Sequence, residues 1–330
     1  MPEGCRCAGI AGLGIYVPER VLTNQDLEKM VDTSDAWIRE RTGIRERRIA
    51  APEEATSDLA AAAARAALAD AGITAGEVDL IIVATATPDT LFPATACLVQ
   101  EKLGADRAGA FDLLAGCSGF IYALACGAQF IAGGAADTVL VVGAETLSRI
   151  VNWEDRNTCV LFGDGAGAAV LRPAPREKGI LATLLGSDGS GGTLLQLPAG
   201  GSRLPASQRT VQENLHYIQM NGREIFKFAV RVMGDAALEV VRKAGLSPEQ
   251  IDLFIPHQAN IRIIDAAARR LGVPMEKVVV NVDRYGNTSA ASVPLALADA
   301  RDAGRLCRGA NIVMVAFGAG LTWAAAAVRW

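Results

Sequence analysis

A cysteine lies among small residues in the stretch LLAGCSGF, residues 113–120. The run before it predicts a buried strand and the apolar residues after Phe120 predict a long helix, so Cys117 stands where a strand passes into a helix. The positive end of a helix and its unpaired N–H groups favour a thiolate, and we expect the pKa of Cys117 to lie below the value of about 8.5 of a free cysteine. The pattern predicts a nucleophile; the alternative is a buried cysteine at a tight corner.

Two polar clusters follow buried strands in the second part of the chain. His257 lies in LFIPHQAN and Asn287 in VVVNVDRYGNTSAAS, each before a predicted helix. Ligand sites of α/β proteins form at the carboxyl ends of strands, so we expect these side chains and Cys117 to converge on one cleft. The alternatives are a hydrogen-bonded histidine at a helix start and an asparagine that caps a helix. The second histidine, His216, is expected to be a strand or loop residue without a catalytic role.

The elements that must position these groups repeat along the chain. AGITAGEVDLII (71–82) is echoed by AGLSPEQIDLFI (244–255), and TVLVVGAE (138–145) by NIVMVAFG (311–318), with 173 residues between the members of each pair. This period is too long for a solenoid repeat. It predicts two copies of one α/β half, residues 1–175 with the nucleophile Cys117 and residues 176–330 with the histidine and the asparagine.

Within each half, apolar runs alternate with Ala-rich helical runs. Because the apolar runs show no two-residue alternation, we expect strands that are covered on both faces and therefore helix–sheet–helix layering. The expected strands are 79–84, 109–114, 138–143, 251–255, 278–282 and 311–316, and the expected helices are 56–71, 117–133, 223–244, 259–271 and 289–303.

Composition excludes several functions. The 330 residues are 51% hydrophobic and 21% charged, with a formal net charge of −4, so the chain can bury a large core and carries no basic stripe typical of a nucleic-acid-binding protein. The apolar stretch 113–134 approaches the length of a membrane span. Its glycines, Gln129 and the adjacent Asp112 favour a helix buried in protein instead, and we expect no membrane association.

The cysteines bear on the compartment. The chain has seven, an odd number, and its start MPEGCRCAGI lacks the charged-then-apolar pattern of a signal peptide, so we expect reduced thiols and a cytoplasmic protein. Cys5 and Cys7 have no second pair and no nearby histidine, so we expect no metal site. Four others in apolar surroundings are expected to be small core residues: Cys97, Cys126, Cys159 and Cys307.

Five motifs taken together resemble the β-ketoacyl-acyl carrier protein synthase III family, the initiating condensing enzymes of bacterial fatty acid synthesis. They are GCSGF, FGDGAGAAV, PHQANIRI, GNTSAAS and AFGAGLTW, in the order and at the spacing of that family. The segment VDTSDAWIRERTGIRER, residues 31–47, resembles its coenzyme A-binding region. The resemblance covers essentially the whole chain and implies a thiolase-like fold, a duplicated αβαβα layered sandwich, usually in a homodimer.

The resemblance implies a decarboxylative Claisen condensation of an acyl-CoA primer, expected to be acetyl-CoA, with malonyl-acyl carrier protein. Cys117 would be acylated, and His257 and Asn287 would donate hydrogen bonds to the enolate left when the malonyl group loses CO₂. Backbone N–H groups of Cys117 and Ala319 would hold the oxyanion, provided that Ala319, where many relatives have glycine, has a negative φ. The products would be 3-oxoacyl-acyl carrier protein, CO₂ and CoA, with no cofactor and no metal.

The resemblance also assigns residues that bind acyl-CoA. Trp37 would stack on the adenine, with Arg156 on the other face of the base and Thr33 in contact with it. Arg41 would lie near the phosphates, and Asn260 would hold the pantetheine arm.

The segment QANIR resembles the docking region for acyl carrier protein. It comprises Gln258, Ala259, Asn260, Ile261 and Arg262. Arg262 and Arg269 are expected on one helix face, where a basic patch on an acidic chain would suit an acidic carrier protein. The alternative is an ordinary solvated helix face.

Phe92 in TLFPAT would lie at the dimer interface and project into the acyl pocket of the partner. A bulky residue there suggests a short primer, although one side chain leaves acetyl, branched and longer primers open. The alternative function is a starter-unit acyltransferase or a related ketosynthase of secondary metabolism on the same scaffold. A degradative thiolase is disfavoured because AFGAGLTW holds no second cysteine, and a non-catalytic scaffold protein is disfavoured by the intact Cys-His-Asn set.

Overall fold

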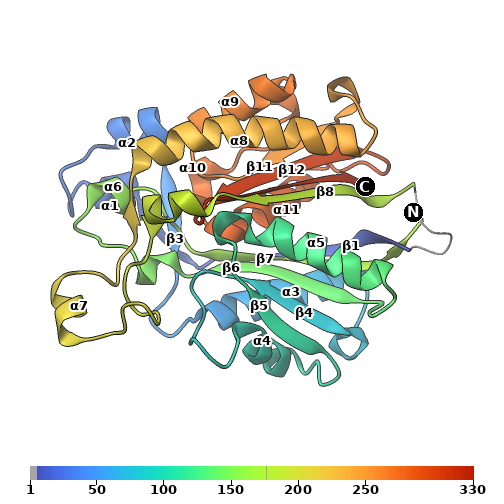
Figure 1. Ribbon diagram of the computed structural model, residues 1–330, viewed down its shortest axis with the longest axis horizontal. Coiled ribbons are helices and arrows are strands. Elements are labelled where there is room, and N and C mark those ends of the chain that lie inside the picture. The colour runs from blue at the N-terminus through green and yellow to red at the C-terminus, as the bar shows by residue number, and fades with distance from the viewer. Residues whose placement is uncertain (1–5, 176) are drawn as a thin grey trace.

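A computed structural model describes residues 6–175 and 177–330 of the chain. Two sheets form its framework (Figure 1), one with the strand order β1-β7-β6-β4-β5 and the other with the order β11-β12-β13-β8. The strands of the first sheet are β1 (Cys7–Tyr16), β4 (Leu80–Ala84), β5 (Gly109–Leu113), β6 (Val139–Glu145) and β7 (Gly165–Ala174). Those of the second are β8 (Gly179–Ser187), β11 (Leu253–Pro256), β12 (Asn311–Gly318) and β13 (Thr322–Arg329).

Helices form three layers around these sheets (Figure 1). The outer face of the first sheet is covered by α3 (Thr56–Ala71) and α4 (Thr95–Leu103), and that of the second by α8 (Gly222–Lys243) and α9 (Ile261–Leu271). Between the sheets lie α5 (Gly119–Ala132) and α11 (Ser292–Asp302). The predicted αβαβα layering is confirmed.

The two sheets repeat one strand order. The order β1-β7-β6-β4 in the first corresponds to β8-β13-β12-β11 in the second, and β11 begins at Leu253, 173 residues after β4 begins at Leu80. This correspondence supports the division into halves 1–175 and 176–330, which we retain as a proposal.

One predicted strand does not form. Residues 278–282 were expected to extend the second sheet as β5 extends the first, but Val278 makes only a single parallel bridge with Phe254, and α10 (Val282–Tyr285) follows. The buried Gln258 side chain explains the difference, because its amide donates to the Val279 carbonyl at 3.0 Å and accepts from the Asn281 N–H at 2.9 Å. The Gln258 side chain thus forms hydrogen bonds with backbone groups that would otherwise have paired with a neighbouring strand.

Helix α5 lies between the two sheets, but the prediction that it is buried on all sides is wrong in part, because Gln129 and Phe130 near its C-terminal end are exposed. Phe120 and Leu124 pack in one core cluster with residues of both sheets, including Ile82 in β4 and Met314 in β12. Burial of such a side chain contributes about 1.5–3 kcal/mol. None of the helices in residues 6–175 and 177–330 is long and apolar enough to cross a membrane.

The outer helix α3 packs on β1 at very short range. A Cβ on Gly14 would lie 2.2 Å from the Ala63 carbonyl oxygen and the Ala67 nitrogen. Glycine in the strand and alanine on the helix therefore allow the two backbones to meet, which explains the Ala-rich composition of residues 59–67.

Short elements surround the end of the sheets where the predicted site lies. They are β2 (Arg20–Thr23), α1 (Asn24–Leu27), α2 (Asp35–Thr42), β3 (Glu46–Ile49), α6 (Arg156–Cys159), β9 (Leu195–Gln196), α7 (Gln208–Gln212) and β10 (Gln219–Met220). Arg47 in β3 is fully buried and donates to the Leu22 carbonyl at 3.2 Å and the Val160 carbonyl at 2.7 Å. These bonds hold the N-terminal segment against the core of the molecule.

The prediction for four cysteines is half wrong. Cys159 is buried and Cys126 is half-buried, but Cys97 and Cys307 are exposed. Cys97 and Cys307 have apolar neighbours in the sequence, but these do not determine whether the cysteine side chain faces the core or solvent. Cys5 lies outside the described residues. Within the described part of the chain, no three His, Cys, Asp or Glu side chains group as metal ligands would.

Candidate active site

Cys117 lies in a single 3₁₀ turn, Gly116–Ser118, directly before α5. This turn packs backbone to backbone against the end of β12: a Cβ on Gly318 would lie 2.5 Å from the Cys117 nitrogen, and one on Gly116 (φ +53°) would lie 2.9 Å from the Ala319 nitrogen. The small residues around the thiol therefore allow a close contact between the two halves. This contact brings the N–H groups of Cys117 and Ala319 near each other.

Ala319 meets the condition that its role as a donor requires. Among non-glycine residues of the described chain, positive φ angles occur at Asn214 and Ser289 and not at Ala319. The backbone at Ala319 is therefore one that an alanine adopts without strain, so its N–H is compatible with the predicted role.

The three predicted catalytic residues meet in one space. Cys117, His257 and Asn287 all line a cavity of about 190 Å³, here called the inner cavity. The other residues in its wall are Asn157, Leu161, Phe162, Leu195, Met220, Gly222, Ile225, Phe226, Ala259, Asn260, Ile263, Phe317 and Gly318. The three side chains thus converge on one cavity as predicted, although Asn287 follows the short helix α10 and not a strand.

The predicted pKa of the thiol is wrong for the ligand-free chain. Burial raises the pKa of Cys117 to about 12, and the nearby charge of Glu145 adds to the rise, whereas the hydroxyl of Ser289 and the N–H of Cys117 itself act in the opposite direction. Loss of water around the sulfur outweighs the favourable end of the helix. The resting nucleophile is a thiol.

His257 follows β11 and is buried, with an exposed fraction of 1%. Its Nδ1 lies 2.5 Å from the Oγ of Ser292 at the start of α11, and the ring of Phe317 packs against it at 5.5 Å between centroids. Burial lowers the pKa of His257 to about 3, so the imidazole is neutral at pH 7. When the Ser292 hydroxyl donates to Nδ1, the ring proton resides on Nε2, which has no protein partner among the described residues.

Asn287 is fixed through its backbone and its amide oxygen. Its N–H donates to the Leu161 carbonyl at 2.9 Å, and its carbonyl accepts from the Gly163 N–H at 3.1 Å. Its Oδ1 accepts from the Ser289 N–H at 2.9 Å. Because the oxygen is engaged, the amide presents Nδ2 as a donor. The inner cavity thus contains a thiol and two neutral hydrogen-bond donors.

A groove of about 780 Å³, here called the entrance groove, leads to the inner cavity. The two spaces share six lining residues: Asn157, Leu161, Met220, Gly222, Phe226 and Asn260. The remaining wall of the groove is formed by Trp37, Arg41, Thr42, Val160, Thr193, Gln219, Asn221, Arg223 and Arg262. Its aromatic and cationic side chains suit a ligand with a flat base and phosphates.

Trp37 has both predicted arginines beside it. The guanidinium of Arg41 lies 5.0 Å and that of Arg156 lies 5.5 Å from its ring centroid. Arg156 is also held by the Asp32 carbonyl at 2.7 Å. A base that stacks on Trp37 therefore has to share this ring with the two guanidinium groups or displace one of them.

The other two predicted CoA contacts differ from each other. Thr33 is not among the residues that line the groove, and its buried Oγ1 has no hydrogen-bond partner in the described chain. Asn260 lines both spaces, but its side chain already donates to the Arg41 carbonyl and accepts from the Arg262 N–H, each at 2.9 Å. Asn260 thereby caps α9 and ties it to α2.

The docking prediction is wrong for Gln258 and Ala259. Both are buried: Gln258 binds the backbone of residues 256–282 through all of its amide atoms, and Ala259 lies in the wall of the inner cavity. Ile261 is half-buried, and its side chain packs close to Gly43. Surface exposure therefore limits the candidate docking residues to the start of α9, where Arg262 is exposed.

The three arginines of α9 are not equivalent. Arg269 pairs with Asp265 at 2.6 Å and Arg270 with Asp235 at 2.5 Å. Arg262 has no carboxylate partner among the described residues and lies 5.4 Å from the ring centroid of Phe226 at the groove. It is the α9 arginine whose charge is available to an acidic partner.

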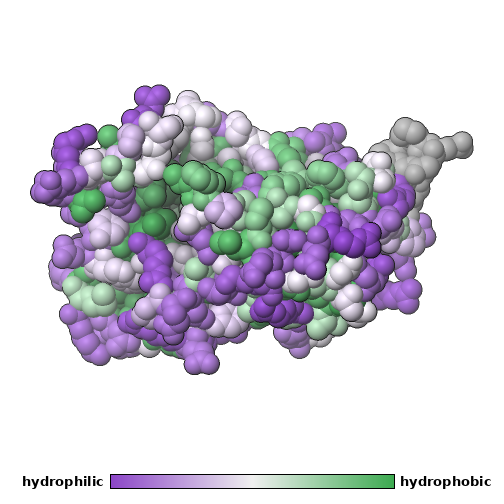
Figure 2. Space-filling view, turned by 90° about the horizontal axis from the view of Figure 1, so that it is seen from below, coloured by the Kyte–Doolittle hydropathy of each residue, from purple (hydrophilic) through white to green (hydrophobic). Residues whose placement is uncertain are grey.

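Phe92 lies outside both spaces. It is 86% exposed, and the adjacent Leu91 is 81% exposed. Figure 2 shows hydrophobic residues gathered in a band across one face of the molecule. Leu114, directly after the edge strand β5, is also exposed. Within a single chain, Phe92 has no acyl pocket to line.

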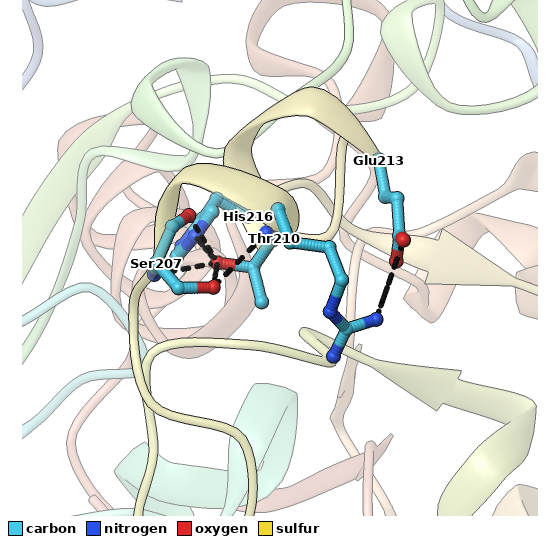
Figure 3. A network of polar contacts seen from close by, with 5 residues as sticks. Ser207, Thr210, Glu213 and His216 are labelled. Carbon is cyan, nitrogen blue, oxygen red and sulfur yellow. Dashed lines mark hydrogen bonds and ion pairs between the residues drawn. The ribbon is translucent and has the colours of Figure 1, made fainter.

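His216 has a local role, as expected. Figure 3 shows it beside α7, where its Nε2 lies 2.9 Å from the Oγ1 of Thr210. The same turn is closed by Ser207, whose hydroxyl accepts from the Thr210 N–H, and by an ion pair of Arg209 with Glu213. His216 is therefore part of the packing of this projecting loop.

Sequence reasoning missed four residues around the inner cavity. Ser289 and Ser292 lie inside the motif GNTSAAS, and Phe317 lies in AFGAGLTW, but no separate role was predicted for them. Glu145 is a carboxylate with no exposed surface at the end of β6. An acidic residue at the end of an otherwise apolar strand, TVLVVGAE, was the available signal.

Comparisons with known proteins agree with this geometry. Residues 111–189 match the family 3-oxoacyl-[acyl-carrier-protein (ACP)] synthase III, and residues 241–330 match its C-terminal family. A curated relative, β-ketoacyl-[acyl-carrier-protein] synthase III of Symbiobacterium thermophilum, is 62% identical over 325 residues, which cover 98% of each chain.

Solved structures extend the match to the fold. The β-ketoacyl-[acyl carrier protein] synthase III of Thermus thermophilus superposes with a TM-score of 0.91 at 55% identity, covering 98% of this chain and 99% of that one. The priming β-ketosynthase of the R1128 polyketide pathway has the same TM-score at 38% identity, covering 100% of this chain and 98% of that one. The chain belongs to the 3-oxoacyl-[acyl-carrier-protein] synthase III family.

Proposed function

We propose that this protein condenses an acyl-CoA primer with malonyl-acyl carrier protein, with release of CO₂ and CoA, as the initiating step of fatty acid synthesis. The observation that carries the proposal is that Cys117, His257 and Asn287 line one buried cavity continuous with a groove containing Trp37 and Arg41. The full-length similarity to β-ketoacyl-[acyl-carrier-protein] synthases III supports the same activity.

The first half-reaction transfers the acyl group. The sulfur of Cys117 attacks the thioester carbonyl, and the N–H groups of Cys117 and Ala319 hold the oxyanion that develops. The bond to the CoA sulfur then breaks, and the thiol proton ends on CoA. One thioester replaces another, so the step is nearly balanced in energy.

The second half-reaction forms the carbon–carbon bond. When the malonyl thioester loses CO₂, negative charge develops on its carbonyl oxygen, and Nε2–H of His257 and Nδ2–H of Asn287 are the donors proposed to hold it. A neutral imidazole suits this role because it donates a hydrogen bond without needing a counter-charge. The carbanion attacks the carbonyl of the acyl-cysteine, the bond to the Cys117 sulfur breaks, and 3-oxoacyl-acyl carrier protein is released. The Cys117 sulfur takes up a proton from solvent and returns to the thiol. The proposed steps use groups of the protein alone, without a cofactor.

The partners follow from the surfaces. Acyl-CoA is proposed to occupy the entrance groove, with its base at Trp37 and Arg156, and acyl carrier protein is proposed to dock at Arg262. The exposed Leu91, Phe92 and Leu114 support a homodimer, because apolar side chains of this size are commonly covered by a partner. The odd cysteine count supports a cytoplasmic location.

A starter-unit ketosynthase of secondary metabolism remains the second candidate. The R1128 priming β-ketosynthase shares the fold over the whole chain. Its identity of 38% is well below the 62% shared with the curated relative, and the difference favours the first function.

Intact-mass spectrometry tests the proposal. After incubation with acetyl-CoA, Cys117 should gain one acetyl mass, and addition of malonyl-acyl carrier protein should remove it and yield 3-oxobutanoyl-acyl carrier protein. The variant Cys117→Ser should gain no acetyl mass. A panel of acetyl, branched and longer primers then separates the two candidate functions. A wild-type protein that gains no acyl mass from any primer would reject both.

A further inference from the structure

His257 is held in place by three contacts. Its backbone N–H donates to the Val315 carbonyl at 2.7 Å, the ring of Phe317 packs against its ring edge to face, and its Nδ1 lies 2.5 Å from the Oγ of Ser292. The other ring nitrogen, Nε2, has no protein partner in the described part of the chain, and His257 lines the inner cavity. The contact at Nδ1 therefore decides whether Nε2 offers a proton or a lone pair to a ligand.

The Ser292 hydroxyl is the donor in this contact. Ser292 is 1% exposed, and its hydroxyl forms no other hydrogen bond with the residues that the structure describes. If Nδ1 carried the ring proton, the hydroxyl proton would lack an acceptor in a buried site, which is unfavourable. Because the hydroxyl donates, Nδ1 accepts, and the proton of the neutral imidazole resides on Nε2.

Ser292 belongs to the segment that carries Asn287. Residues 287–292 are all buried, and α11 begins at Ser292. Within this segment the Ser292 N–H donates to the Ser289 carbonyl, and the Ser289 N–H donates to Oδ1 of Asn287 at 2.9 Å. One short stretch thus fixes both side chains, since it contains Asn287 and bonds His257 through Ser292.

We propose that, given the proposed function, Ser292 is a positioning residue that keeps the proton of His257 on Nε2 and holds this donor beside Nδ2 of Asn287. The enolate oxygen then meets two N–H groups whose places are set by one segment. A ring with the opposite tautomer would present a lone pair to the developing negative charge and oppose it. Ser292 is not among the residues that line the inner cavity, so it acts through His257.

This role predicts a selective loss. The proposed oxyanion donors for acylation are the N–H groups of Cys117 and Ala319, and neither depends on the Ser292 hydroxyl. The proposed donors for decarboxylation include Nε2–H of His257, which does. Removal of the hydroxyl should therefore slow decarboxylation more than acylation, whereas a residue that only supports the fold would affect both steps.

The tautomer of His257 can be measured without a substrate. The chain has two histidines, His216 and His257, so isotope-labelled histidine gives two sets of ring nitrogen signals, which His216→Gln assigns. In the wild type, long-range proton–nitrogen NMR spectra should place the His257 proton on Nε2. Ser292→Ala should shift the Nδ1 signal, because its hydrogen bond is lost. A proton on Nδ1 in the wild type would overturn the proposal, whether or not the protein has the proposed activity.

Release of CO₂ from malonyl-acyl carrier protein measures the consequence. Cys117→Ala keeps His257 and Asn287 and cannot be acylated. Addition of Ser292→Ala to it should lower the decarboxylation rate by about tenfold and change the KM for malonyl-acyl carrier protein by less than about twofold. Acetylation of Cys117 in the single variant Ser292→Ala, followed by intact mass, should slow by less than about threefold.

The opposite outcomes are distinct. A similar loss in decarboxylation and in acetylation would mean that Ser292 only holds the site together, and the positioning role would be rejected. If Cys117→Ala releases no CO₂ and the wild type gains no acyl mass, the proposed function fails, and the NMR spectra still test which nitrogen of His257 carries the proton.

Two further variants serve as controls. Ser292→Thr keeps the hydroxyl and should restore most of the rate and of the Nδ1 signal. Ser57 is also a serine of 1% exposure in the first turn of a helix, but its hydroxyl donates to Asp89 at 2.7 Å. Ser57→Ala should leave decarboxylation within about twofold of its original rate. If it slowed the reaction as much as Ser292→Ala, loss of any buried hydroxyl would explain the effect and the proposal would be wrong.

Discussion

The inner cavity and the entrance groove are adjacent, but different groups line them. No arginine or lysine of the described chain lies in the wall of the inner cavity, whereas Arg41, Arg223 and Arg262 line the groove. Burial keeps His257 neutral and Cys117 protonated in the cavity, while the groove arginines are in contact with solvent. The inner cavity is thus lined without cationic side chains, whereas the entrance groove is cationic and open to solvent.

The difference assigns separate tasks to the two spaces. In a dry site, a neutral donor aimed at developing charge stabilises a transition state strongly because little water competes with it. In the exposed groove, charges and rings mainly attract and hold an anionic ligand. Changes in the cavity should therefore lower rates, and changes in the groove should raise the KM of one substrate.

The largest effect is expected from removal of a cavity donor. His257→Ala or Asn287→Ala should lower the rate of malonyl decarboxylation by about 10²–10³-fold, because one donor to the enolate oxygen is lost. Acetylation of Cys117 should fall much less, since neither side chain belongs to the oxyanion hole. Radiolabelled CO₂ release and intact mass measure the two steps. Equal losses in decarboxylation and in acetylation would contradict the proposal that these two side chains serve only the decarboxylation step.

The dryness of the cavity can be tested through stability. The pKa of His257 falls from its ordinary 6.5 to about 3 in the fold, so between these values the unfolded chain binds a proton that the folded chain does not. Stability is therefore lost as pH falls below 6.5, by about 2 kcal/mol at pH 5 relative to pH 7 and above. Urea unfolding of the wild type and of His257→Gln at pH 7 and pH 5 measures this. A variant with the same loss as the wild type would show that the cavity is wet.

Two arginines on one face of α9 offer a matched pair, because Arg262 lines the entrance groove and Arg269 does not. Arg262→Glu should raise the KM for malonyl-acyl carrier protein by about tenfold and leave acetylation by acetyl-CoA nearly unchanged. Arg269→Glu, with the same charge change at a residue already paired with Asp265, should have a smaller effect. Indistinguishable effects of the two variants would mean that docking responds to net charge and not to Arg262.

The smallest effect is expected at the aromatic platform. Trp37→Ala should raise the KM for acetyl-CoA by about fivefold, the loss of a stacking contact of about 1 kcal/mol, with little change in kcat. Trp153→Ala is the control, because Trp153 lines a different hollow of about 320 Å³. If the two substitutions had equal effects, Trp37 would not be the platform for the base.

Much of the site could be predicted from local sequence. Cys117 and His257 each follow a strand and precede a helix, as their sequence patterns predict. Asn287 was identified by the same pattern, although α10 and not a strand precedes it. The repeat at 173 residues predicted the layered architecture. Neither the repeat nor the polar clusters required a known structure to be recognised. The pKa of Cys117 could not be predicted in this way, because it depends on the loss of water around the sulfur.

Hydrogen bonds between side chains and distant backbone groups also could not be predicted from the local sequence. Gln258 follows His257, the proposed catalytic residue, in a segment that resembles a docking region, yet its side chain is buried and pairs with backbone groups that a further strand would have paired. The sequence does not show that the Gln258 amide forms hydrogen bonds with the backbone of Val279 and Asn281, which lie more than twenty residues away. Exposure depends on what packs against a residue from elsewhere in the chain.

The sequence by itself determined the candidate catalytic residues, the duplicated α/β layering and the family, because strand and helix periodicity and small-residue turns are local properties. Only the tertiary structure decided which groups share a cavity, which arginine of α9 is left without a carboxylate, and that the carboxylate of Glu145 is fully buried. The reason is that burial and long-range hydrogen bonds set charge states, and both arise only when distant segments pack together.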